Sequence, residues 1–246
     1  RHDMSIESQL LERVRAALRG EIRLDHRLQH VHLTLNADGS VTVEAEAPSV
    51  AVKKLALERI GAVPGIGGIV DRLHVARASK MGDHEIRAHV RDAFIEEPAF
   101  KRFDIREWRH GSFELAQGAA AKAYGSLDIE VNDGVVTLNG RVPGLESKRL
   151  AGVMAWWVPG TRDVVNGIVV DPPEDDGPDH IAEAVRIALE KDPFVDASQI
   201  GVGVSGRAVT LTGLVPTETE CRRAEDDAWC IFGVDDVTNK IKVASE

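Results

Sequence analysis

The chain contains three copies of one pattern, and this internal repeat constrains its fold more than any other feature. The segments 41–75, 136–170 and 209–243 align with one another without a gap. The shared positions include three sets of identical residues: Pro48, Pro143 and Pro216; Ala56, Ala151 and Ala224; Gly65, Gly160 and Gly233. Agreement over so many positions indicates three tandem copies of one structural repeat.

Each repeat predicts a helix, two strands, a second helix and a third strand. An apolar residue recurs every four positions in the first helix, as in the rows Leu10-Val14-Leu18, Ile86-Val90-Phe94 and Ile181-Val185-Leu189. Two alternating strands with a glycine turn between them follow each row. The shared proline then ends the second strand. We expect Asp83 and Asp179 to cap first helices, and Ser49 and Thr217 to cap second helices.

These elements predict an α+β protein of three tandem αββαβ repeats, each with a three-stranded mixed sheet and two helices on one face. The predicted repeats are 5–77, 82–171 and 179–244, and an insertion near 101–126 interrupts the second. An acidic, proline-rich linker at 171–178 precedes the third repeat. Because a core of about 70 residues is only marginally stable alone, we expect the repeats to pack on one another.

Composition excludes several classes of protein. The net charge of −10 is concentrated in the last third of the chain, which disfavours nucleic acid as a partner. No apolar run approaches the ~18 residues of a transmembrane segment. Cys221 and Cys230 lie more than two turns apart in one predicted helix, beyond disulfide reach. We take Met4 as the natural start and expect a cytoplasmic protein, or a periplasmic one if a signal peptide has been removed.

All three repeats resemble BON domains, so the chain is predicted to be a tandem of three BON domains, with the second and third repeats the closest to the family pattern. The pattern in the second repeat is Asp133-Gly134-Val135-Val136-Thr137-Leu138, then Val158-Pro159-Gly160, then Val165-Asn166-Gly167. The third repeat is similar through 208–215 and Gly233-Val234, whereas the first is more divergent and has Ala45 in place of a shared glycine. The resemblance implies a binding protein of osmotic or envelope stress, like the osmotically inducible periplasmic member. It also implies contact with anionic phospholipid or protein, and no catalytic motif.

Tryptophans of the second helices are the first candidates for an interaction surface. Trp156 lies well off the apolar stripe of its helix, and Trp229 occupies the same position in the third repeat. Trp157 is adjacent. Large aromatic side chains on an outward helix face need a partner. They either pack between repeats or form an external contact with lipid, peptide or a second chain.

The insertion is the second candidate surface. It carries Trp108, Arg109 and Phe113 beside other cationic residues. This mixture suits an anionic membrane or an acidic partner, and it equally suits a loop that covers the sheet edge. The glycines Gly65, Gly160 and Gly233 are assigned to structural turns.

These observations favour a non-enzymatic protein without cofactor or metal, which acts through phospholipid or protein contacts. Its histidines lack the spacing and the cysteine or carboxylate support of a metal site. One alternative is a potassium-responsive module that binds the cation through carbonyl oxygens at a turn. A second is a structural or chaperone-like protein without a small ligand. An oligomer is compatible with each of them.

Overall fold

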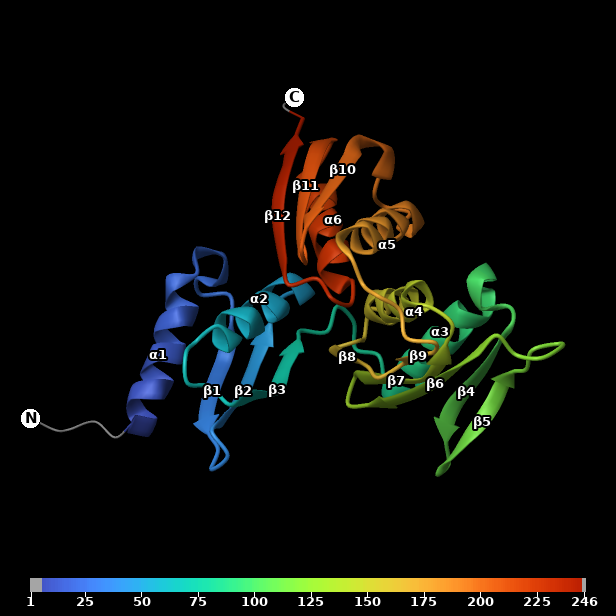
Figure 1. Ribbon diagram of the computed structural model, residues 1–246, viewed down its shortest axis with the longest axis horizontal. Helices are drawn as coiled ribbons and strands as arrows, with labels where there is room; N and C mark the ends of the chain where they lie inside the picture. Colours follow the sequence, from blue (N-terminus) through green and yellow to red (C-terminus); the bar gives the residue numbers. More distant parts are fainter. Residues whose placement is uncertain (1–5, 245–246) are drawn as a thin grey trace, which may run out of the picture. The chain divides into compact units, whose positions relative to one another are not determined.

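The computed structural model describes residues 6–244, so the proposed start at Met4 and the first residue of the predicted first repeat lie outside the described part. The chain forms two compact bodies, an N-terminal body (1–76) and a C-terminal body (77–246). The colours of Figure 1 follow the elements along the chain. No helix among the described residues is long and apolar enough to cross a membrane.

The N-terminal body contains one complete αββαβ repeat. Its elements are α1 (Ile6–Gly20), the short 3-10 helix η1 (Ile22–Leu24), β1 (Gln29–Leu35), β2 (Ser40–Ala47), α2 (Val50–Gly61) and β3 (Gly68–Val75). Strand β2 is central; it pairs antiparallel with β1 and parallel with β3. The predicted cap Ser49 is confirmed, because its side chain accepts a hydrogen bond from the N–H of Val52.

The C-terminal body contains the second and third repeats. The second comprises α3 (Asp83–Glu96), η2 (Pro98–Phe100), β4 (Phe103–Arg109), β5 (Ser112–Gln117), β6 (Gly125–Asn132), β7 (Val135–Val142), α4 (Leu145–Trp157), β8 (Asp163–Asn166) and β9 (Val169–Val170). The third comprises α5 (Pro178–Lys191), η3 (Ala197–Gln199), β10 (Ile200–Ser205), β11 (Ala208–Val215), α6 (Glu218–Cys230) and β12 (Asp236–Val243). Figure 1 shows α5 and α6 beside the β10–β11–β12 sheet.

The α+β class is confirmed, but the sheet of the second repeat has six strands instead of three. Its order is β5-β4-β6-β7-β8, and β9 also pairs with β7. The predicted insertion adds β4 and β5 as a hairpin, with β4 parallel to β6. The last strand is divided into β8 and β9, whereas β12 of the third repeat is continuous. Period-two alternation was too short-ranged a signal to show these additions within the insertion.

Two predicted helix caps are wrong. Gly82 and Gly177 occupy the N-cap positions of α3 and α5, so Asp83 and Asp179 lie within the first turns. The Asp83 carboxylate instead accepts hydrogen bonds from the N–H groups of Asp133 and Gly134, both at 2.8 Å. It therefore anchors α3 to the β6–β7 turn. The predicted cap Thr217 is confirmed on Glu220 N–H.

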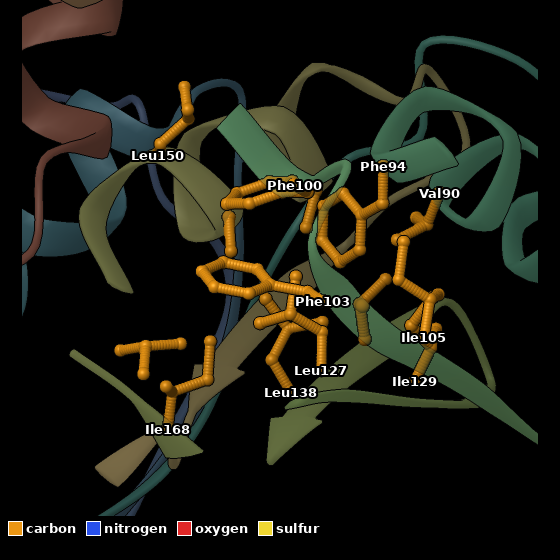
Figure 2. Packing of buried hydrophobic residues seen from close by; sticks show 14 of the residues in the cluster. Val90, Phe94, Phe100, Phe103, Ile105, Leu127, Ile129, Leu138, Leu150 and Ile168 are labelled. Atoms are coloured by element: carbon orange, nitrogen blue, oxygen red, sulfur yellow. The ribbon is translucent and has the colours of Figure 1, made fainter. Parts of the chain in front are cut away.

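The core of the second repeat is built around three phenylalanines. Phe94, Phe100 and Phe103 come from α3, η2 and β4, and all three are buried. The ring centroids of Phe94 and Phe100 are 5.4 Å apart, and those of Phe100 and Phe103 are 5.3 Å apart. Figure 2 shows these rings against Ile105 and Leu127 of the sheet. The first strand of the inserted hairpin thus shares the core of the repeat, which fixes its position.

Candidate interaction surface

The inserted hairpin forms the edge of the six-stranded sheet. His110 and Gly111 connect its strands in a two-residue turn, and both have positive φ, 51° and 85°. Such turns match the right-handed twist of paired strands. The sequence left open a loop that covers the sheet edge; the segment instead extends the sheet. Because one strand of the hairpin packs into the core, the positions of its outer side chains are fixed.

Alternation along the hairpin divides its side chains between two faces. Phe103 and Ile105 point into the core, so Trp108 lies on the opposite, outer face. Trp108 pairs across the strands with Phe113, and their ring centroids are 5.0 Å apart in an edge-to-face arrangement. Leu115 is on the same outer face. The exposed fractions of Trp108, Phe113 and Leu115 are 37%, 38% and 63%. We call these three residues the hairpin patch.

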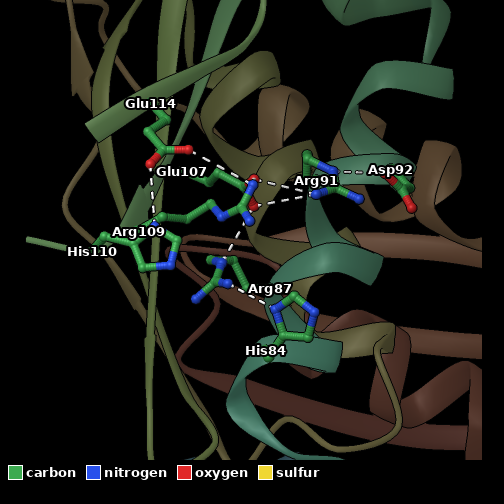
Figure 3. Close-up of polar contacts among 8 residues, drawn as sticks. All are labelled: His84, Arg87, Arg91, Asp92, Glu107, Arg109, His110 and Glu114. Atoms are coloured by element: carbon green, nitrogen blue, oxygen red, sulfur yellow. Dashed lines mark hydrogen bonds and ion pairs between the residues drawn. The ribbon is translucent and has the colours of Figure 1, made fainter. Parts of the chain in front are cut away.

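A buried glutamate holds the inner face of the hairpin against α3. Glu107 is 3% exposed and accepts hydrogen bonds from Arg87 Nε at 3.3 Å, Arg91 Nη1 at 3.2 Å and Arg109 Nη1 at 3.4 Å. Figure 3 shows the three guanidinium groups converging on this carboxylate. A hydrogen bond to Asp92, and to a lesser extent one to Glu107, raises the pKa of Arg91 above its ordinary value. Since two of the arginines come from α3, the network fixes the hairpin to the helix.

The two arginines beside the hairpin patch are paired with carboxylates. Arg109, a predicted surface residue, contacts Glu107 and also lies 3.7 Å from Glu114. Arg106 makes a bidentate pair with Asp128, with contacts of 2.7 and 2.8 Å, and lies 5.9 Å from the Phe113 ring. The sequence showed the arginines but not the carboxylates that face them. The hairpin patch is therefore apolar with a neutralised rim.

The edge strand is irregular in a way that limits further pairing. Ile105 pairs with Gln117 and Arg106 with Leu115, so Ala116 is an extra residue that forms a bulge. Bulges on edge strands twist the backbone away from an incoming strand. This geometry favours a partner on the outer face over a strand added to the edge.

Two of the three tryptophans of the second helices, Trp157 and Trp229, are engaged within the chain, and the assignment of Trp156 stays a prediction. Trp229 is 1% exposed, so its assignment to that surface is wrong. Trp156 and Trp157 are half-buried, and Trp157 Nε1 donates to Asp227 Oδ1 at 2.9 Å. Helix α4 packs against both α5 and α6. The alternative interpretation, packing between repeats, therefore holds for Trp157. The sequence could not show that α4 packs against α5 and α6.

The three turn glycines have different structural reasons. Gly65 and Gly233 have φ of 95° and 94°, which L-residues rarely adopt. Gly160 is instead required for space, because a Cβ atom there would lie 2.7 Å from Met81 Cβ.

No group of three or more His, Cys, Asp or Glu side chains within 6–244 could hold a metal ion. The sequence interpretation also missed Leu115, Glu107 and Asp227. The alternation of Phe113 and Leu115 was a usable signal for the first. Nothing in the sequence distinguished the two buried carboxylates from the exposed ones.

The fold and this surface define a tandem-repeat α+β protein with an apolar contact patch. The BON domain family matches residues 114–172 and 177–245, which is more than half of the chain, and the chain belongs to this family. Its BON segments therefore place it among proteins built on a binding domain. The match begins within β5 and does not include the first repeat, whose assignment to the family stays a prediction.

No curated protein matches the chain. Two solved structures of CdsD, a structural protein of the type III secretion system of Chlamydia trachomatis, are similar to it at 13% and 12% identity. They align over 96% of this chain and over 92% and 98% of theirs, with TM-scores of 0.25. At such low TM-scores the likeness supports no conclusion about fold or function.

Proposed function

We propose that this chain is a non-enzymatic BON-type binding protein that holds a partner protein against the hairpin patch. The observation that carries the proposal is the exposure of Trp108, Phe113 and Leu115 together on a rigid hairpin. Aromatic residues in a fixed position are the usual centres of binding energy at protein interfaces. Their positions are set before binding by the Glu107 network, so little conformational entropy is lost on contact.

Charge favours a protein over an anionic bilayer as the partner. The arginines beside the patch, Arg106 and Arg109, are paired with carboxylates. Residues 1–76 contain as many basic as acidic residues, so the C-terminal body carries the whole net charge of −10. A body of this charge is repelled by anionic lipid headgroups. This repulsion disfavours the phospholipid contact that the family resemblance implies, and the implied stress role stays a prediction.

The chemistry of the patch supports binding without catalysis. Its three side chains carry no nucleophile or carboxylate, and Arg106 is held by Asp128. Catalysis requires a positioned acid, base or nucleophile beside the bound substrate. An apolar patch with a neutralised rim provides contact area alone.

A photo-reactive amino acid at Leu115 tests the proposal in cells. Leu214, which is 53% exposed on β11 of the third repeat, is the matched control position. We expect discrete protein adducts from position 115 and none of the same mass from position 214. Adding Trp108→Ala should reduce these adducts at least tenfold, the effect of removing about 1.4 kcal/mol of binding energy.

Vesicle flotation with anionic and neutral lipid distinguishes the lipid alternative. Flotation that depends on Trp108, without protein adducts at position 115, would show that the hairpin patch binds a membrane instead of a protein. Circular dichroism should show an unchanged fold for Trp108→Ala, because this side chain lies outside the core. The potassium-responsive and chaperone-like alternatives stay predictions.

A further inference from the structure

A pair of buried carboxyl groups lies where the second repeat meets the third within the C-terminal body. Asp227 of α6 is 2% exposed, and Asp192, the C-cap residue that follows α5, is 1% exposed. Trp157, the last residue of α4, donates its indole N–H to Asp227 Oδ1 at 2.9 Å. This hydrogen bond joins the two repeats directly, and it does not involve the hairpin patch.

The two carboxyl groups are satisfied to different degrees. Asp192 accepts the N–H of Phe194 at 2.9 Å through Oδ1 and is paired with Arg223 through Oδ2. Asp227 Oδ2 is buried and has no hydrogen-bond partner among the described residues. A buried, unpartnered carboxylate oxygen is costly, whereas a protonated one can donate a hydrogen bond. The geometry therefore suits a neutral acid at Asp227.

The charges around Asp227 point the same way. Asp192 faces it from the end of α5, Arg223 contributes the positive charge from α6 itself, and α4 contributes the neutral Trp157. Lys191 of α5 is directed elsewhere, to Glu97 at 3.0 Å. One guanidinium beside two carboxyl groups leaves one negative charge to be neutralised by a proton. Burial is the main cause that raises the pKa of Asp227 from 3.8 to about 8, and Asp192 adds to it.

We propose that the contact between α4 and α6 is a pH-sensitive joint, closed while the Asp227–Asp192 pair holds a proton and loosened as that proton is lost. An opened joint exposes Asp227 to water, where it ionises at its ordinary, lower pKa. Closing therefore takes up one proton between about pH 4 and pH 8. By linkage, the closing equilibrium weakens about tenfold for each pH unit over this range and becomes constant above pH 8.

Hydrogen–deuterium exchange of the full chain between pH 5 and pH 9, corrected for intrinsic exchange, measures this opening. In the wild type, protection of α6 should fall about tenfold per pH unit up to pH 8, while strand β11 stays protected. In Asp227→Asn the amide replaces the neutral acid and donates to Asp192, so protection should not change with pH. Glu218→Gln, an exposed carboxylate on the same helix, should behave like the wild type.

Three results would overturn the proposal. One is equal protection of α6 at pH 6 and pH 8.5 in the wild type. Another is an Asp227→Asn protein that still follows the wild-type profile. The third is parallel loss of protection in β11, which would mean that the third repeat unfolds instead of separating.

Trp157→Phe provides an independent variant if Asp227→Asn does not fold. The indole N–H lowers the pKa of Asp227, so its removal should raise that pKa. The pH at which protection becomes constant should then move above 8. An unchanged or lower value would contradict the assignment of the proton to this pair.

Discussion

At the scale of single residues, Glu107 shows how the insertion is integrated into the repeat. It lies opposite Glu114 on the neighbouring strand, a like-charge pair that would destabilise an isolated hairpin. Arg109 bridges the two carboxylates, and Arg87 and Arg91 reach Glu107 from α3. The arginines of α3 therefore help to offset the cost of burying this glutamate, and they couple formation of the hairpin to the helix.

Glu107→Gln should lower the free energy of unfolding of the chain by about 2 to 3 kcal/mol. The substitution removes the charge that three guanidinium groups share, and the partial exposure of the arginines keeps the loss below that of a fully buried pair. Urea unfolding measures the change. Glu114→Gln, at the half-exposed end of the network, should cost less than about 1 kcal/mol. Equal losses for the two variants would contradict the central role of Glu107.

At the scale of elements, one glycine position sets the spacing of the first two strands in two of the repeats. Gly140 and Gly213 have φ of 116° and 141°. A Cβ atom on either would lie 2.1 Å from the Ser126 carbonyl oxygen or 2.0 Å from that of Gln199. The first repeat has Ala45 at this position, and its β1–β2 pairing contains an irregularity between Gln29 and His32. The divergent residue and the altered strand register occur together.

Gly140→Ala should therefore destabilise the second repeat by about 3 kcal/mol or more, because both the backbone conformation and the close carbonyl oppose a side chain. Gly203→Ala is the matched control within a strand. Its added Cβ would lie 3.9 Å from the nearest atom, so it should change stability by less than about 1 kcal/mol. Thermal melting of the two variants gives the comparison. A Gly140→Ala protein as stable as the control would show that the strands can separate at no cost.

At the scale of the whole molecule, three repeats in sequence become two compact bodies. The N-terminal body has its own buried residues, including Val41, Leu55 and Leu73. The second and third repeats share one body through the packing of α4 against α5 and α6. The expectation that repeats pack on one another is met between these two.

Fragments 1–76 and 77–246 should each fold when produced separately. Each should give a single cooperative thermal transition by circular dichroism, and we expect the larger fragment to be more stable because it buries a larger fraction of its surface. Fragment 77–172 lacks the third repeat, so Trp157 and Arg149 lose their contacts to that repeat. Its melting temperature should be at least about 5 °C below that of fragment 77–246. An equal melting temperature would show that the two repeats are energetically independent.

The repeat pattern by itself determined the α+β class and the order of the helices and strands that the three repeats share, and the motifs of the second and third repeats indicated the BON family. These depend on local periodicity and on turn residues such as Pro143 and Gly134, which act within a few positions of the chain. The same local signals placed the Ser49 and Thr217 caps but misplaced those of α3 and α5, where glycines hold the N-cap positions and the Asp83 side chain accepts hydrogen bonds from another element.

Only the tertiary structure decided which of the candidate side chains face solvent. Trp108 and Trp229 have the same chemistry, yet one lies on the open face of a sheet and the other is buried within the C-terminal body. The sequence alone also could not show the local charge of this surface, because Arg106 and Arg109 are paired with carboxylates from neighbouring strands. Burial and ion pairing depend on residues far apart in the chain, and no local pattern in one sequence records which distant residues meet.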